Sequence, residues 1–233
     1  MKLLDYIFKF LKKGYMDKLQ LRQECAPLMS ANTISDNLKL IDIFLEYFFL
    51  IINEHQKDTL KTQVEADARM MFQMIFSKAL NLKKILEGVE YESNGIKLNK
   101  IVDPTIVASL IRNLYETVCV FELVYIIHDS DEERNLLYNL WVISGLKYRQ
   151  KFSSSVQTPE GKAKIDEEEK LIQSFIKEIE DSAIYKRMTP DNQNKINQKI
   201  KDKDYKIHVV KDNVRFLNWQ EVSELYTGAN KDL

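Results

Sequence analysis

The sequence is poor in the residues on which several protein classes depend. It contains two cysteines, three histidines, six glycines and four prolines in 233 residues. The two cysteines, Cys25 and Cys119, cannot build the disulfide framework of a small secreted domain, and they indicate a reducing compartment. The scarcity of glycine and proline favours helices over an all-β fold. We therefore expect a cytoplasmic, mainly helical protein.

An excess of charge of either sign is also missing. Lysine and arginine number 34 and the acidic residues 35, so the formal net charge is −1 and the isoelectric point is about 6.4. This balance provides no general attraction to nucleic acid or to an anionic membrane. The hydrophobic fraction of 45% is sufficient for a well-filled core and is not typical of a disordered chain.

The sequence motifs of the common nucleotide-dependent and hydrolytic enzymes are absent. There is no Walker loop, no Gly-x-Gly-x-x-Gly, no Gly-x-Ser-x-Gly, no Cys-x-x-Cys and no zincin histidine pair. The three histidines stand in unrelated contexts and none follows a Glu-x-x pattern, which leaves a catalytic triad or a di-iron site without support. We expect no metal and no cofactor, and the sequence leans against an enzyme without excluding one.

Helix boundaries are clearly marked. Three prolines follow a capping residue, in Asp103-Pro104, Thr158-Pro159 and Thr189-Pro190, and each pair predicts the start of a helix. Apolar periodicity predicts helices at about 3–13, 35–53, 58–87, 103–127, 130–151, 159–187 and 219–227. The segment 91–100 is predicted to be a polar loop around a turn dipeptide. Alternation in 205–210, with a turn toward 214–217, predicts a short hairpin.

These elements predict an all-α fold, a helical bundle of about five to seven helices with a small C-terminal appendage that holds the short hairpin. We expect three parts: an N-terminal amphipathic segment at 1–29, the bundle at 30–188 and a C-terminal subdomain at 189–233. The N-terminal helix is basic and short, which favours docking on the core or on a second subunit over binding to a membrane surface.

The predicted helix from Asp103 to Ile127 is apolar on nearly all sides, which is typical of a helix at the centre of a bundle. Its charged residues Arg112, Glu116 and Glu122 exclude a membrane span, because each is costly near the bilayer centre. Arg112 and Glu116 are one turn apart and predict a buried pair. Such a pair could fix helix register, which we favour, or form a site with Glu116 as acid or base and Arg112 holding an anionic group. The candidate polar core site consists of Arg112, Glu116, Asn113, Arg134 and Tyr138.

Two further segments invite a functional interpretation. The run from His128 to Arg134 superficially suggests a metal site, but its spacing fits no calcium loop. A helix capped by Ser130, with acidic residues in its first turn, explains the run better. The C-terminal region offers a candidate nucleic-acid contact, although nearby aspartates dilute its charge and a solvated face is favoured. Its residues are Lys199, Lys201, Lys203, Lys206, Lys211 and Arg215.

The central helix and the C-terminal region also resemble a family of uncharacterised bacterial helical proteins with a central Arg-x-x-x-Glu helix. The resemblance rests on Asp103-Pro104, Ala108-Ser-Leu-Ile-Arg112-Asn-Leu-Tyr-Glu116, Phe121, Tyr125, Asp131-Glu-Glu133, Tyr138 and Leu217-Asn-Trp219. It covers about residues 40–225 and implies a bacterial helical bundle without an assigned activity. The family pattern continues into a further helix with Tyr, Ser and His that these 233 residues do not contain. The bundle is also remotely similar to the HEPN group, yet no arginine here has the histidine that a ribonuclease of that group needs.

The leading hypothesis is a cytoplasmic binding or interaction protein that self-associates through one of its two nearly all-apolar helices, 41–52 or 106–127. One alternative is an enzyme of unassigned class that uses Arg112 and Glu116. A second is nucleic-acid binding through the lysine-rich C-terminal region. The sequence names no substrate, partner or pathway.

Overall fold

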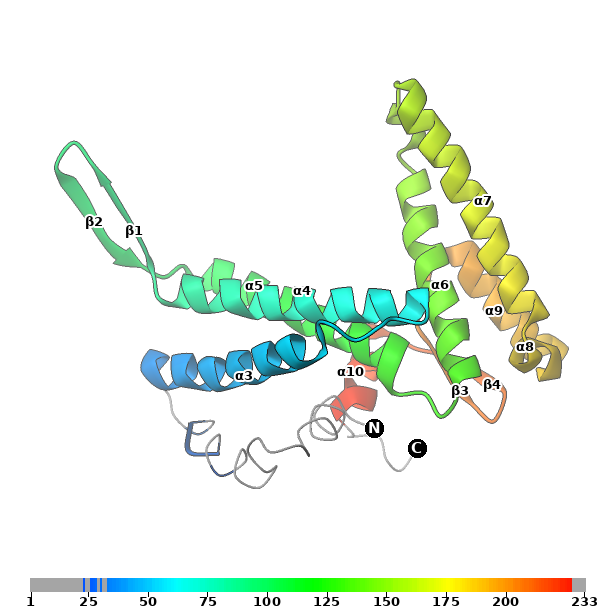
Figure 1. The fold of residues 1–233 in the computed structure, drawn as a ribbon, viewed down its shortest axis with the longest axis horizontal. Helices are drawn as coiled ribbons and strands as arrows, with labels where there is room; N and C mark the ends of the chain where they lie inside the picture. Colours follow the sequence, from blue (N-terminus) through cyan, green and yellow to red (C-terminus); the bar gives the residue numbers. More distant parts are fainter. Residues whose placement is uncertain (1–22, 24–25, 29, 31–32, 228–233) are drawn as a thin grey trace. The chain divides into compact units, whose positions relative to one another are not determined.

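The computed structural model describes residues 23, 26–28, 30 and 33–227. These residues are predominantly helical and include two small two-stranded sheets, which confirms the predicted all-α class with a small C-terminal appendage (Figure 1). The predicted helix at 3–13 lies outside the described residues. The chain packs as two compact units, unit 1 ending at Phe121 and unit 2 beginning at Glu122. This division does not coincide with the predicted boundary between residues 188 and 189.

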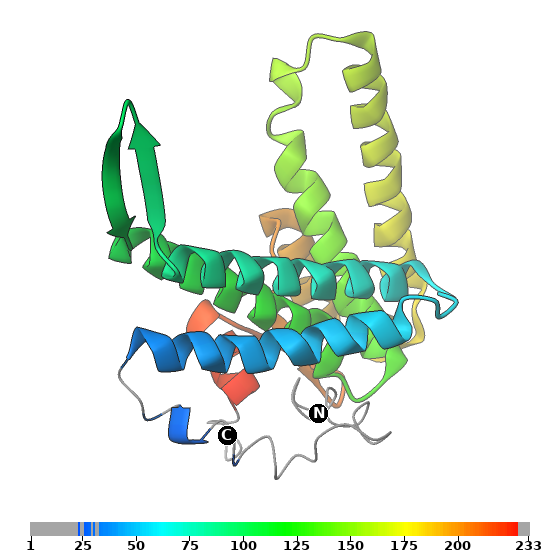
Figure 2. The same cartoon turned by 60° about the vertical axis from the view of Figure 1, so that its left-hand side comes forward.

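Unit 1 is a layer of three helices with a β-hairpin. Its elements are α3 (Ile34–His55), α4 (Gln63–Leu86), β1 (Val89–Ser93), β2 (Ile96–Ile101) and α5 (Pro104–Phe121). Helix α4 contacts both α3 and α5. The hairpin connects α4 to α5 and projects beyond the ends of these helices, as two views agree (Figures 1 and 2). The segment 91–100, predicted as a loop, is therefore mostly strand.

Side-chain caps set the helix boundaries of unit 1. The hydroxyls of Thr33 and Thr62 accept hydrogen bonds from backbone N–H groups in the first turns of α3 and α4. The Asp103 carboxylate does the same for α5, because its Oδ1 accepts from the Thr105 N–H at 2.8 Å. These caps satisfy N–H groups that have no partner within a helix. Arg69 of α4 then closes the end of α3 by donating to the Asp58 carbonyl at 3.1 Å.

The interior of unit 1 is small. Ring contacts connect the three helices, with Phe48 4.9 Å from Phe72 and Phe72 6.0 Å from Phe121 between ring centroids. Ile75 at the middle of α4 is only 1% exposed. Helix α5 buries side chains only near its C-terminal end, and its earlier turns are largely exposed. The prediction that this helix lies at the centre of a bundle is wrong.

Unit 2 contains the remaining elements. They are η2 (Glu122–Ile126), α6 (Asp131–Gln150), η3 (Ser153–Ser155), α7 (Pro159–Asp181), α8 (Ala183–Arg187), α9 (Pro190–Asp202), β3 (Ile207–Val210), β4 (Asn213–Phe216) and α10 (Trp219–Thr227). Helix α6 contacts α7, α8 and α9, and strand β4 contacts α9. The strands β3 and β4 form the predicted C-terminal hairpin. Apolar side chains of these elements fill a dense core, in which Ile143, Ile172, Ile196 and Ile207 are all 0% exposed.

Two predicted helices are interrupted. The helix expected through Ile127 changes after Phe121 into a π-helical turn, in which the Ile127 N–H donates to the Glu122 carbonyl at 3.1 Å. The bond spans five residues instead of four, as in a π-bulge. The helix expected through Arg187 ends before Ser182, whose extended backbone (φ −65°, ψ 145°) separates α7 from α8.

A compact polar network closes the end of α9. Lys203 ends the helix in the left-handed region, with φ 59°. The Asp204 carboxylate then accepts hydrogen bonds from Lys199 Nζ at 2.7 Å and Lys206 Nζ at 2.5 Å. Burial raises the pKa of Asp204, but the hydrogen bonds from the two lysines outweigh it and lower this pKa to about 2. The Lys199 side chain is only 8% exposed, so it depends on this carboxylate for its charge partner.

Replacing Asp204 tests whether this network stabilises unit 2. Asp204→Asn keeps the size of the side chain but leaves the Lys199 ammonium without an anion. We expect the free energy of unfolding at neutral pH to fall by about 2 kcal/mol, which is the stabilisation that the lowered pKa of Asp204 represents. Because the folded-state pKa is depressed, the stabilisation is present above the ordinary value of 3.8 and is lost as the pH falls toward 2. Chemical denaturation across this pH range measures both effects.

The control for this experiment is Asp202→Asn, two residues earlier in the sequence and on the exposed surface. The Asp202 carboxylate accepts hydrogen bonds from the side chain of Gln198. We expect a change of less than about 0.5 kcal/mol in the control. An equal loss of stability in both variants would contradict the role given to Asp204.

Candidate functional site

The predicted Arg112–Glu116 pair forms, but on the surface. Arg112 Nε donates to Glu116 Oε1 at 2.8 Å, and the two side chains are 81% and 41% exposed. The prediction of a buried pair is therefore wrong. An exposed pair of this spacing on one helix contributes little to stability and cannot use desolvation to tune a pKa. Both the structural and the catalytic interpretation of a buried pair lose their basis.

The other members of the predicted polar core site have different partners. Asn113 is exposed on α5. Arg134 pairs with Asp131 at 2.9 Å in the first turn of α6. Tyr138 is buried beside aromatic rings, with its ring centroid 6.3 Å from that of Phe175. The five predicted residues therefore have separate partners and do not form one site.

The segment after the π-helical turn is a helix cap, as predicted. The Ser130 hydroxyl accepts the Glu133 N–H at 3.2 Å, and the Glu133 carboxylate accepts the Asp129 N–H at 3.1 Å. Within the part of the chain that the structure describes, no group of three His, Cys, Asp or Glu residues is placed to hold a metal ion. His128 is half-buried and hydrogen-bonds to backbone carbonyls of the π-helical turn, and desolvation lowers its pKa to about 4.

The six basic residues of the predicted nucleic-acid contact are divided among several environments. Lys199 and Lys206 pair with Asp204. Lys211 occupies the turn between β3 and β4, and Arg215 lies on β4 opposite His208. Lys201 and Lys203 line a cleft instead. Because Lys199 is 8% exposed, it offers no surface for a polyanion.

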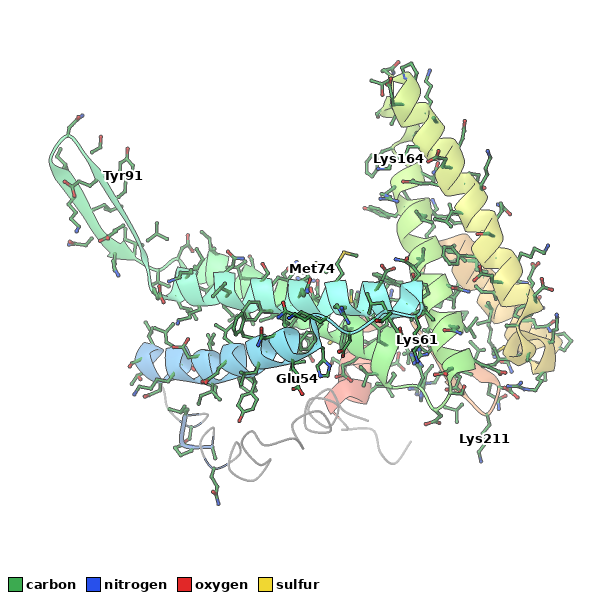
Figure 3. The ribbon with its side chains drawn as sticks, viewed as in Figure 1. Glu54, Lys61, Met74, Tyr91, Lys164 and Lys211 are labelled. Atoms are coloured by element: carbon green, nitrogen blue, oxygen red, sulfur yellow. The ribbon has the colours of Figure 1, made fainter. Side chains whose placement is uncertain are left out.

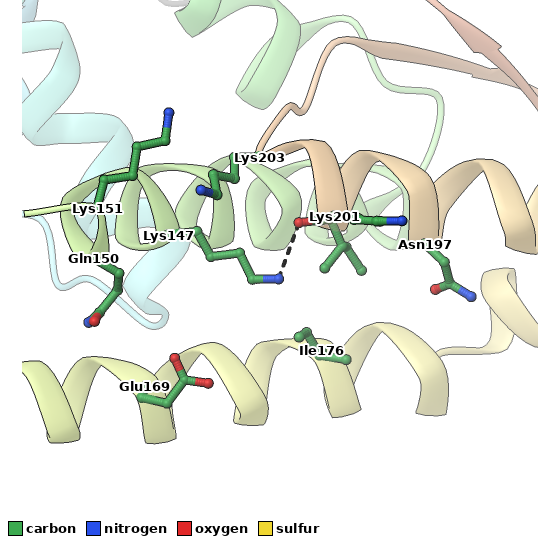
Figure 4. Close-up of a pocket in the computed structure, with 9 residues that line it drawn as sticks. Lys147, Gln150, Lys151, Glu169, Ile176, Asn197, Lys201 and Lys203 are labelled. Atoms are coloured by element: carbon green, nitrogen blue, oxygen red, sulfur yellow. Dashed lines mark hydrogen bonds between the residues drawn. The ribbon is translucent and has the colours of Figure 1, made fainter. Parts of the chain in front are cut away.

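The cleft lies between α6, α7 and the end of α9, and its volume is about 470 Å³ (Figure 4). It is lined by Lys147, Gln150, Lys151, Glu169, Ile176, Asn197, Ile200, Lys201 and Lys203. Lys147 and Lys151 were not among the residues that the sequence pointed to. Their spacing of four residues places them on one face of α6, which was an available signal, but nothing in the sequence shows that α9 ends against that face.

The most exposed apolar feature of unit 1 is the β1–β2 hairpin. Tyr91 pairs with Leu98 and Ser93 with Ile96, so these side chains share one face, whereas the Glu92–Lys97 pair occupies the other. The register then shifts, and Val89 pairs with Ile101. In a regular ladder Lys100 would lie opposite Val89. Because of the bulge, Ile101 and not Lys100 lies on the same face of the hairpin as Tyr91.

The result is a ribbon with one apolar and one charged face. We call the set Val89, Tyr91, Ile96, Leu98 and Ile101 the apolar hairpin face; the exposed fractions of its side chains are 56%, 67%, 78%, 50% and 51%. Figure 3 shows Tyr91 on the hairpin, away from the helices of unit 1. On the charged face Lys97 Nζ is 3.4 Å from Glu90 Oε2. The hairpin lacks any covering layer on its apolar face among the described residues.

Exposed apolar side chains continue on the helices of the same unit. Met70 and Met74 of α4 are 62% and 41% exposed, and Ile111 and Tyr115 of α5 are 51% and 44% exposed. Of the twenty large apolar side chains that are exposed in the described part of the chain, fourteen belong to unit 1. Unit 1 is therefore the part of the structure with unsatisfied apolar surface.

Comparisons with known proteins do not supply an identity for either unit. No protein-family model, no curated protein and no solved structure matches the chain. The resemblance to uncharacterised bacterial helical proteins stays a prediction. None of the described helices combines the length and the apolar character needed to cross a membrane.

The lowered pKa of the half-buried His128 predicts that the stability of the protein depends on pH. Its folded-state pKa of about 4 lies below the ordinary value of 6.5, so protonation favours the unfolded chain. We expect full stability above about pH 6.5 and a loss of up to about 3 kcal/mol as the pH falls to 4. His208, whose pKa is also lowered by burial, adds to the loss in the same direction.

The measurement is urea denaturation at several pH values for the natural chain and for His128→Gln. Glutamine retains a hydrogen-bond donor but does not titrate, so the variant should show a clearly smaller loss between pH 6.5 and 4. Equal pH dependence in the two proteins would contradict the assignment to His128.

Proposed function

We propose that this chain is an interaction protein that self-associates, and that the apolar hairpin face is the contact between two copies. The observation that carries the proposal is the arrangement of this face: all five of its large apolar side chains are at least half exposed, and a bulge aligns the last of them with the others. A hairpin of two strands is marginally stable in water unless another layer packs on it. A second copy provides that layer.

The amount of apolar surface favours a dimer of moderate affinity. The apolar hairpin face presents on the order of 500 Å², which is the patch size that often marks interaction sites. Covering it on two copies removes roughly 1,000 Å² from water, near the lower limit for a specific interface. We therefore expect dissociation in the micromolar range, with the exposed apolar side chains of α4 and α5 available to extend the contact.

A second copy fits the face better than an unrelated partner for reasons of symmetry and charge. An apolar face is complementary to itself, so a two-fold contact covers both hairpins at once. The charges of the hairpin balance, because Glu90 and Glu92 of β1 oppose Lys97 and Lys100 of β2. With a net charge of −1 on the whole chain, two copies repel each other little.

The alternatives have weaker support. An enzyme built on Arg112 and Glu116 would need an enclosed or desolvated pair, and these side chains are exposed. Nucleic-acid binding through the lysine-rich region is disfavoured because Lys199 and Lys206 already pair with the Asp204 carboxylate. Self-association through an all-apolar helix, as the sequence suggested, is replaced in this proposal by association through the hairpin.

The decisive variant places charges on the apolar hairpin face. Tyr91→Glu with Leu98→Lys introduces a cross-strand ion pair, which leaves the net charge unchanged and preserves strand pairing. Sedimentation velocity of the full chain from about 1 to 100 μM should show a dimer for the natural protein and a monomer for the variant, because the charges would be desolvated in the contact.

The matched control exchanges the charges of the opposite face, Glu92→Lys with Lys97→Glu. This variant carries the same number of changes in the same two strands and should associate as the natural protein does. A natural protein that stays monomeric at about 100 μM, or an apolar-face variant that dimerises like the control, would refute the proposal.

A further inference from the structure

The cleft of unit 2 has the dimensions of a small-molecule site. Its volume of about 470 Å³ falls within the range of about 300–1,000 Å³ typical of ligand pockets. In Figure 4, Glu169 and Ile176 of α7 face the space from one side, and α6 and α9 bound it from the other. All its lining residues belong to unit 2, so it is independent of the hairpin of unit 1.

The charge of the cleft is strongly positive. Four lysines, Lys147, Lys151, Lys201 and Lys203, line it against the single carboxylate of Glu169. Among the described residues, none of these four ammonium groups has a carboxylate within ion-pair distance. Five other basic residues of the same unit are paired, namely Arg149, Arg187, Lys195, Lys199 and Lys206. Lysines such as Lys170 and Lys177 that have no ion pair within the described part of the chain stand singly on the exposed face of α7. The positive charge of the cleft is thus uncompensated, in a chain whose total charge is nearly zero.

Helix capping explains only part of this cluster. Lys147 Nζ donates to the Ile200 carbonyl at 3.2 Å, and the Ser144 hydroxyl donates to the Lys203 carbonyl. Cations near a helix C-terminus are favourable because they oppose the helix dipole, which accounts for Lys147. Lys151 follows the last residue of α6, and its ammonium lies 4.5 Å from the ring centroid of Tyr148. That exposed contact contributes only about 0.5–1 kcal/mol and does not hold the side chain against a stronger partner.

The remaining lining residues resemble the wall of a ligand site. Ile176 and Ile200 provide an apolar surface, and the amides of Gln150 and Asn197 provide polar groups beside it. An apolar wall with a few polar groups beside it is the usual composition of a site for a small molecule. The Glu169 carboxylate is available to accept hydrogen bonds from ligand hydroxyls.

We propose that this cleft binds a small molecule that carries a chain of two or more phosphates. Lysine ammonium groups are compact charges with three donors each, and they suit the oxygens of linked phosphates. Several uncompensated charges around one space favour a polyvalent anion over a single phosphate. In Figure 4 the Lys151 ammonium points away from α7, so binding turns this side chain inward by a rotamer change.

The test uses the full chain and two probes, inorganic triphosphate and adenosine triphosphate, with inorganic phosphate for comparison. Isothermal titration calorimetry should detect binding of triphosphate at least about tenfold tighter than that of phosphate. Tighter binding of the nucleotide would assign its base and sugar to the apolar wall of Ile176 and Ile200. Equal binding would assign recognition to the phosphate chain alone, and either result supports the proposal.

The variant Lys151→Gln with Lys201→Gln removes two charges without touching the capping bond of Lys147. It should weaken triphosphate binding by about tenfold or more while far-ultraviolet circular dichroism and sedimentation stay unchanged. The control, Lys170→Gln with Lys177→Gln, makes the same change of charge at exposed positions of α7 that do not line the cleft. The control should bind triphosphate as the natural chain does.

Three outcomes would overturn the proposal. The first is the absence of any binding of triphosphate to the natural chain, and the second is an equal loss of affinity in the variant and the control. The third is binding of a single-stranded oligonucleotide more tightly than either triphosphate probe, which would make the cleft part of a nucleic-acid surface. None of these outcomes bears on self-association through the hairpin.

Discussion

Burial of apolar side chains is the constraint on which the arrangement of unit 1 depends, and its three helices do not meet it alone. Of the twelve largest fully buried side chains among the described residues, only Ile75 belongs to unit 1. Among the described residues of unit 1, α4 packs on α3 at one side and on α5 at the other. The exposed methionines of α4, the exposed turns of α5 and the apolar hairpin face follow from this shortage. Because each buried CH₂ group contributes about 0.8 kcal/mol, covering this apolar surface by association would stabilise unit 1 beyond what its described helices supply.

Unit 2 satisfies the same constraint within itself. Helices α7, α8 and α9 pack on α6, and isoleucines of these three helices and of β3 are almost completely buried. Its polar groups close the helix ends: Ser130 caps α6, and Asp204 gathers Lys199 and Lys206 at the end of α9. A unit with this interior has no need of a partner for stability. What remains without a partner in unit 2 is the positive charge of the lysine cleft. We therefore propose different partners for the two units, a second copy for unit 1 and a small anion for unit 2.

The features that the sequence predicted correctly are local. Ser130 caps a helix, and the proline pairs after Thr158 and Thr189 begin α7 and α9, because capping chemistry depends on residues only a few positions apart. The C-terminal hairpin was also predicted from alternation. The hairpin of unit 1 carried a comparable signal in Asn94-Gly95, whose positive φ angles of 53° and 77° form the turn. The many charged residues of the segment made it look like a polar loop. The bulge before Ile101 also interrupts the alternation of apolar and polar residues that marks a strand.

The errors concern which side of an element is covered. The helix containing Arg112 is rich in apolar residues because its outer face carries Ile111 and Tyr115, not because it lies at the centre of a bundle. Apolar periodicity identifies a helix but not the layer that packs on each side of it. The lysine cleft was missed for the same reason, since α6 and the end of α9 are separated by about fifty residues in sequence.

A second copy that covers the apolar hairpin face would complete unit 1. Amide hydrogen exchange measured by mass spectrometry at increasing protein concentration tests this claim most directly, with peptides from β1–β2 compared with peptides from α7. A hairpin covered by a second copy should gain protection as the concentration rises through the dissociation constant, while α7 should not change. Exchange of the hairpin that is rapid and independent of concentration, in a protein that remains folded, would contradict the claim.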